Sequence, residues 1–167
     1  MFHKMKGTGV APGRPDPLQI LTGLIGGIAG IGAVAYLTHM ANVPLLMAPF
    51  GATCVLLFAA PGAPLAQPRN VIGGHFIAAA VGLIMMNLFG SGEWQMAVGV
   101  GIAIALMQFF RAVHPPAGAN PLVALTAGIQ DWEFLVTPVL FGSVILVCVA
   151  LLINNIGKAK QWPQYWM

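Results

Sequence analysis

The chain has 167 residues, of which 58% are hydrophobic and only 7% are charged, and its mean hydropathy is +0.85. This composition excludes an ordinary soluble domain and is typical of a protein embedded in lipid. The seven basic and four acidic residues, which sum to a net charge of +3, divide the chain into long uncharged runs.

These uncharged runs predict the helical elements. A helix needs about 20 residues to cross the hydrocarbon core, so the run between Asp16 and Arg69 holds two crossings and each later run holds one. Pro, Gly and Asn mark most junctions. We therefore predict an all-α, polytopic membrane protein that forms a single transmembrane domain over 1–167, with spans at 19–41, 44–60, 71–88, 94–110, 113–128 and 134–155.

The charges also predict an orientation. With six crossings and a cytoplasmic N-terminus, all basic residues fall on the cytoplasmic side, in agreement with the positive-inside rule. The segments 1–17 and 156–167 are then cytoplasmic. In the alternative, the second and fifth segments are re-entrant, four spans remain, and Arg69 and Arg111 move outside. The residues placed inside by the first arrangement are Lys4, Lys6, Arg14, Arg69, Arg111, Lys158 and Lys160, and those placed outside are Glu93, Asp131 and Glu133.

An internal repeat is the next prediction. The sequence PFGAT at 49–53 matches PAGAN at 116–120 at an offset of 67 residues, and two further glycine matches lie at offsets of 69 and 68. Many transporters are built from repeats that meet around the substrate path. Three crossings in each half would make the two repeats, 19–90 and 94–155, inverted relative to each other, whereas two crossings and a re-entrant segment in each half would make them parallel.

The chemically unusual stretch is RAVHPPAGANP at 111–121. Pro115 and Pro116 lack N–H groups, so a helix ending near Arg111 is predicted to break and restart here. The N–H groups of a helix start attract anions, and His114 and Asn120 add side-chain donors. The sequence therefore predicts an anion site at this break.

The matching stretch at 49–53 predicts a second broken helix, with Thr53 at the position of Asn120. Irregular backbone is tolerated inside a membrane where it lines a cavity between repeats. The predicted substrate-binding residues are Gly51, Ala52, Thr53, His114, Pro115, Pro116, Gly118, Ala119 and Asn120.

At these residues the sequence resembles the HPP family of integral membrane proteins, named for the His-Pro-Pro found here at 114–116. The resemblance extends to APFGAT at 48–53 and to QPRN at 67–70 followed by GGH at 73–75, and it covers about 16–155. It implies a small transporter-like protein with plant plastid relatives and with cyanobacterial relatives associated with nitrite transport. Family descriptions commonly count four spans, which keeps the re-entrant alternative open.

Three further polar residues have two interpretations each. Arg111 and Arg69 either attract an anion to the cytoplasmic mouth or mark topology, and Arg69 follows Pro68 in a predicted turn. His75 either lies on the pathway or hydrogen-bonds a neighbouring helix beside Gly73 and Gly74. The tryptophans at 162 and 166 are expected at the cytoplasmic interface.

The absence of certain residue types and motifs from the sequence excludes several possible mechanisms. No Asp or Glu lies inside a predicted span, so proton coupling would have to use His114 or His75. The sequence has no metal-ligand cluster, phosphate-binding loop or nucleophile beside a base, so we expect no enzyme activity, catalytic residue, metal or cofactor.

The sequence therefore favours a transporter or channel for a small inorganic anion, with nitrite first by resemblance alone. The alternatives are a membrane scaffold or regulatory module and a channel for a small neutral solute. The expected partners are the lipid bilayer and the anion, without nucleic acid, and the glycine-rich faces also permit a homo-oligomer. The short chain without a transit peptide favours a bacterial inner membrane.

Overall fold

A computed structural model describes residues 9–157 and 161–166 and contains long helices with clear end signals. Helix α1 (Pro17–Ala41) begins where the Asp16 carboxylate accepts a hydrogen bond from the Gln19 N–H at 2.8 Å, and it ends at Asn42, whose φ is 52°. A side-chain cap at the start and a left-handed residue at the end are common helix boundaries. Helix α3 (Pro68–Phe89) follows, and α4 (Glu93–Phe109) returns after Gly90.

The second, fifth and sixth passages of the chain through the bundle each combine a short α-helix with non-α helical or extended backbone. The second begins with α2 (Pro49–Cys54) and continues as the wider helix η2 (Val55–Ala59), after an irregular approach over 43–48. The short helix η3 (Pro64–Ala66) then leads to α3. The fifth begins with η4 (Pro115–Ala119), a 3-10 helix, and continues as α5 (Asn120–Thr126). Both predicted breaks therefore occur at their prolines.

The last pass consists of η5 (Leu135–Leu140) followed by α6 (Phe141–Ile153). It contains a break that the sequence analysis does not predict, because Thr137 has φ −132° and ψ 108° ahead of Pro138. The sequence predicts one continuous span over 134–155, whereas the structure interrupts it within its first turn and a half.

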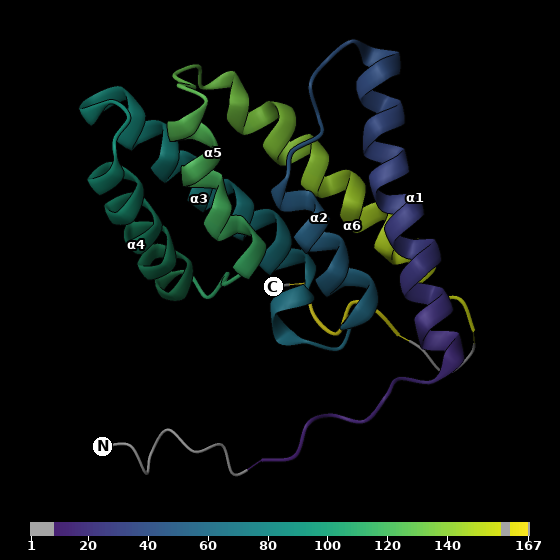
Figure 1. The fold of residues 1–167 in the computed structure, drawn as a ribbon. Helices are drawn as coiled ribbons and strands as arrows, with labels where there is room; N and C mark the ends of the chain where they lie inside the picture. The colour runs from purple at the N-terminus through teal and green to yellow at the C-terminus, as the bar shows by residue number, and fades with distance from the viewer. Residues whose placement is uncertain (1–8, 158–160, 167) are drawn as a thin grey trace.

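The direction of the chain alternates from α1 to α6 in Figure 1, and the described ends at both termini lie toward the same end of the bundle. Three helical stretches, Pro17–Ala41, Pro68–Phe89 and Leu135–Ile153, are long and apolar enough to cross a membrane alone. Pro49–Ala59 and Glu93–Phe109 are shorter apolar helices. The prediction of an all-helical polytopic membrane protein is confirmed.

Polar and apolar side chains are distributed as a membrane protein requires. Large apolar side chains are exposed along the outer helix faces, for example Ile28 at 67% and Phe109 at 77%. In contrast, several polar side chains are fully buried inside the bundle, among them Thr53, His75, His114 and Asn120. Lipid accepts apolar surface, while polar groups inside a membrane need partners within the protein.

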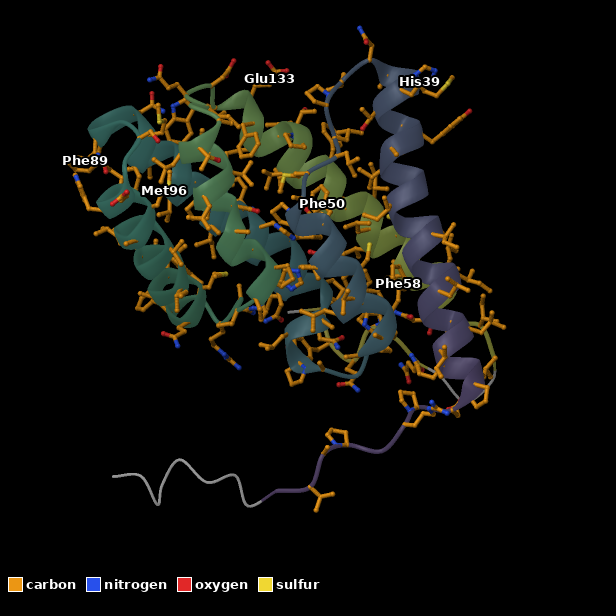
Figure 2. The ribbon with its side chains drawn as sticks, in the orientation of Figure 1. His39, Phe50, Phe58, Phe89, Met96 and Glu133 are labelled. Carbon is orange, nitrogen blue, oxygen red and sulfur yellow. The ribbon has the colours of Figure 1, made fainter. Side chains whose placement is uncertain are left out.

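The charged residues gather at the two ends of the bundle. Arg69 starts α3 and Arg111 follows α4, so both lie at the end where α1 begins. Glu133 lies at the opposite end of the bundle, the end at which α1 finishes with His39 in its last turn (Figure 2). Four of the basic residues used to predict orientation, Lys4, Lys6, Lys158 and Lys160, lie outside the described residues.

The described part of the C-terminal segment packs against the bundle. Trp162 is only 4% exposed and belongs to the main hydrophobic cluster with Phe58 and Ala150. Trp162 therefore packs within the protein, whereas Trp166 is 55% exposed.

Candidate polar site at the helix breaks

Four polar side chains meet between the two broken elements and α3. Thr53 comes from α2, His75 from α3, His114 from the residue before η4, and Asn120 from the start of α5. All four have 0% relative exposure. Each of them is a predicted binding or pathway residue, and the structure brings all four together.

The Thr53 hydroxyl stands between the two histidines. Its Oγ1 lies 2.8 Å from His75 Nε2 and 3.0 Å from His114 Nε2. It also lies 3.2 Å from the carbonyl oxygen of Pro49, one turn earlier in α2. The two imidazole rings contact each other edge to face, with centroids 5.0 Å apart.

The other nitrogen of His75 faces Asn120. His75 Nδ1 lies 3.1 Å from the Asn120 Nδ2 and 3.3 Å from its Oδ1, and Nδ2 donates to the His75 carbonyl at 2.9 Å. Thr53 and Asn120, which the motif match makes equivalent, therefore contact opposite sides of one ring. His114 Nδ1 lies 2.9 Å from the carbonyl of Leu65 in η3.

Small residues and an aromatic ring allow this close approach. A Cβ at Gly74 would lie 2.7 Å from His114 Cβ and 2.9 Å from the Ala112 carbonyl, so only glycine lets α3 pass the His114 backbone at this distance. Phe50 packs edge to face on His75 with centroids 5.1 Å apart, and Figure 2 shows it on α2 at mid-bundle. The cluster is thus enclosed by packing rather than by solvent.

Arg69 and Asn70 attach the start of α3 to the segment before His114. The Arg69 guanidinium donates to the carbonyls of Phe110 and Arg111 at 2.8 and 3.2 Å, where α4 ends. Asn70 Nδ2 donates to the Val113 carbonyl at 2.8 Å. Cations at a helix C-terminus satisfy unpaired carbonyls, so Arg69 holds the turn that positions His114. Arg111 is exposed and has a φ of 55°.

The other predicted residues lie around the cluster rather than within it. Ala52, Pro115, Pro116 and Ala119 contribute to an open groove of about 640 Å³ that lies over both breaks. Gly51 lines a different hollow, against α1, and a Cβ at Gly118 would meet nothing within 4 Å.

The backbone N–H groups at the two breaks already have partners. Phe50 and Gly51 donate to the carbonyls of Met47 and Ala48, and Ala117 donates to that of His114. The donors that converge at the breaks are therefore side chains rather than the free N–H groups expected at a helix start. Leu65 and Phe50, which complete the cluster, carried no polar signal that sequence reasoning could use.

This geometry defines a class of protein: an integral, polytopic helical membrane protein with a buried polar cluster where two broken helices meet. Comparison with known proteins agrees. A family model described as HPP, transmembrane region, matches residues 12–163. The chain belongs to this HPP family of transmembrane proteins.

Two related transmembrane proteins of Dictyostelium discoideum are each 34% identical to the chain, over 178 and 176 aligned residues and 99% of its length. The chain spans 62% and 57% of the lengths of these curated relatives. No solved structure matches it.

Proposed function

We propose that this protein is a transporter or channel for a small inorganic anion, bound by the side chains of Thr53, His75, His114 and Asn120. Nitrite is the first candidate, because the family that the sequence resembles has cyanobacterial members associated with nitrite transport. The observation that carries the proposal is the convergence of hydroxyl, imidazole and amide groups from both helix breaks at a fully buried point. Ionisable and polar groups at such depth are costly without a use.

Binding would exchange internal hydrogen bonds for bonds to the anion. Each internal neutral bond contributes about 0.5 to 1.5 kcal/mol, whereas a bond to an ion is roughly twice as strong. Because the donors have mutual partners at 2.8 to 3.1 Å, the site is satisfied without ligand and is held closed. Weak binding of a singly charged ion by neutral donors also permits its release.

Inverted repeats are part of this proposal, and the packing of the glycines supports them. A Cβ at Gly30 in α1 would meet Cys54, Phe58 and Leu146, and one at Gly99 in α4 would meet Met85, Pro121 and Leu125. Two of the three contacts in each set, Cys54 with Pro121 and Phe58 with Leu125, are related by the same 67-residue offset as the two breaks. The first helix of each half therefore packs on its own broken helix in the same way.

The third helices exchange partners between the halves. A Cβ at Gly74 in α3 would lie 2.9 Å from the carbonyl of Ala112, and one at Gly142 in α6 would lie 3.2 Å from the carbonyl of Leu45. Leu45 and Ala112 are again 67 residues apart. Reciprocal packing of this kind is what an approximate two-fold axis between inverted repeats would produce.

The route to the cluster is assigned to the end bearing Arg69 and Arg111, where positive charge would raise the local anion concentration. We place this end in the cytoplasm by the positive-inside rule, with both termini on the same side. A bacterial inner membrane remains the proposed location. No chemical step on the anion is part of the proposal.

The test is uptake of nitrite, nitrate and chloride into proteoliposomes, with a membrane-potential readout. Wild type, His114→Ala and Asn120→Ala are compared with Asn154→Ala, which removes another buried asparagine that donates to a carbonyl, that of Leu57. Selective nitrite flux that is lost in the first two variants and kept in the third is expected. Folded wild-type protein with no flux above empty liposomes would overturn the proposal and favour a regulatory module.

A further inference from the structure

The hydrogen bonds of the cluster have one consistent direction when both histidines are neutral. The Leu65 carbonyl can only accept, so His114 Nδ1, which lies 2.9 Å away, must carry the proton. A neutral imidazole has one N–H, and His114 Nε2 is therefore an acceptor. Its partner at 3.0 Å is the Thr53 hydroxyl, which donates to it.

The direction continues through Thr53 to His75. Having donated its single proton, the hydroxyl must accept from His75 Nε2 at 2.8 Å, so this nitrogen carries the N–H. His75 Nδ1 is then an acceptor, and the Asn120 amide donates to it at 3.1 Å. The order runs from Asn120 through His75, Thr53 and His114 to the Leu65 carbonyl, with different tautomers on the two histidines.

We propose that the His75–Thr53–His114 chain carries one proton across the cluster with each anion, which makes the protein a proton–anion symporter. This inference rests on the anion transport proposed above and assigns its coupling ion.

The heavy atoms already offer acceptors for an added proton at either histidine. If His75 is protonated, its Nδ1–H faces the Asn120 Oδ1 at 3.3 Å, and its Nε2–H still donates to Thr53. If His114 is protonated, its Nε2–H donates to Thr53, and the hydroxyl proton turns to the Pro49 carbonyl at 3.2 Å. Neither state requires a new partner, although in the first state Asn120 Nδ2 gives up its bond to His75 Nδ1 and keeps the one to the His75 carbonyl at 2.9 Å.

Transfer between the two histidines balances within the chain. The Nε2 proton of protonated His75 moves to Thr53 Oγ1 while the hydroxyl proton of Thr53 moves to His114 Nε2. His75 is left neutral with its proton on Nδ1, Thr53 remains a hydroxyl, and His114 carries the positive charge. The transfer is completed when His114 loses the added proton on the side where the anion leaves. Rotation of the hydroxyl and a tautomer change at His75 then restore the starting order.

The surroundings provide no fixed counter-charge at this depth in the described part of the chain. Helix α4, which packs against α3, carries one acidic residue, Glu93. This residue begins α4 and therefore lies at the opposite end of that helix from the segment leading to His114. Apart from the two histidines, the titratable or charged side chains on α2, α3, α4 and α6 and on the segment 110–114 are Cys54, Arg69, Glu93, Arg111 and Cys148. A protonated histidine here would thus take its counter-charge from the transported anion, and the neutral pair would cross without moving charge through the membrane potential.

The tautomers give a test that does not depend on transport. The chain has four histidines, and replacing His3 and His39 with Gln leaves the two of the cluster. Nitrogen-15 NMR of labelled protein at neutral pH is expected to show one ring protonated at Nδ1 and one at Nε2, with the Nδ1–H signal lost in His114→Ala. The same tautomer on both rings would overturn the proposed order.

The transport test measures nitrite uptake together with the internal pH of proteoliposomes, corrected for empty liposomes. Wild type is compared with Thr53→Val, which removes the hydroxyl at equal shape, and with Thr53→Ser, which keeps it. For wild type we expect proton entry equal to nitrite entry and no change in membrane potential. For Thr53→Val we expect proton-coupled nitrite uptake to fall about tenfold or more, and for Thr53→Ser we expect it to be restored. The size of the decrease follows from a proton-transfer contribution of about 10²-fold.

Electrogenic nitrite flux without proton entry, or equal coupling in Thr53→Val, would overturn symport and leave anion transport standing. Absence of both fluxes from folded wild-type protein would overturn both proposals together. The folded state of each variant is checked by its elution profile and helical circular dichroism.

Discussion

Thr53 and Asn120 hold opposite nitrogens of the same imidazole, with Thr53 Oγ1 2.8 Å from His75 Nε2 and Asn120 Nδ2 3.1 Å from His75 Nδ1. The two residues occupy matching positions in PFGAT and PAGAN. One ring on α3 therefore ties together the two broken helices. A change at any of these three positions is expected to alter the other two.

The first prediction concerns Asn120. Asn120→Ala is expected to lower nitrite uptake about tenfold or more, because a hydrogen bond to an ion contributes about 1.5 to 3 kcal/mol. Its thermal stability should fall by no more than that of Asn154→Ala, since buried hydrogen bonds in membrane proteins average about 0.6 kcal/mol. Equal uptake in the two variants would contradict a special role for Asn120.

The second prediction concerns the glycines at the close approaches. Gly74→Ala and Gly142→Ala should each destabilise the protein by about 1 to 3 kcal/mol, because a Cβ would overlap His114 or Phe50 in a packed core. Gly32→Ala is the control, since its Cβ would meet nothing within 4 Å, and alanine is slightly favoured over glycine in a helix. Thermal unfolding in one detergent measures all three. Destabilisation by Gly32→Ala equal to the other two would refute the packing explanation.

The third prediction separates the two arginines. Arg69→Gln should destabilise the protein by about 1.5 to 3 kcal/mol, because it removes charged donors from the carbonyls of Phe110 and Arg111. Arg111→Gln should leave stability unchanged within about 0.5 kcal/mol, since this side chain is exposed. Both variants should lower uptake at low salt, and the difference from wild type should shrink at high salt because of screening.

The fourth prediction concerns topology. In protein whose Cys54 and Cys148 have been replaced, single cysteines at the exposed positions Gly62 and Ser91 should react from opposite sides of the membrane. Six crossings with a cytoplasmic N-terminus place Gly62 inside and Ser91 outside. The reverse pattern would support the alternative with re-entrant second and fifth segments.

Much of the fold could be predicted because its signals are local. Proline removes an N–H and clashes with the preceding turn, so the breaks at Pro49 and at Pro115 were visible in the sequence. Uncharged length predicted α1, α3 and α4 to within three residues at each end. The break at Thr137 was missed because one proline near a span end gives no sign of how far the helix is interrupted.

The candidate site was predicted in part for the same reason. His114, Asn120 and Thr53 were selected because polar residues beside helix breaks are unusual in apolar sequence. His75 was assigned to the pathway or to helix packing, and its central position depends on how α3 rotates against both breaks. The Leu65 carbonyl, which fixes the His114 tautomer, is a backbone group brought near by tertiary packing, so no sequence pattern could indicate it.

Binding of a small anion among these four side chains can be observed in a nitrite titration of protein with nitrogen-15-labelled histidine. The His75 and His114 signals are expected to shift together and saturate, while the His39 signal, from the exposed end of α1, stays unchanged. Chloride at equal ionic strength is the control. Unchanged His75 and His114 signals at nitrite concentrations that saturate uptake would rule out anion binding at this cluster.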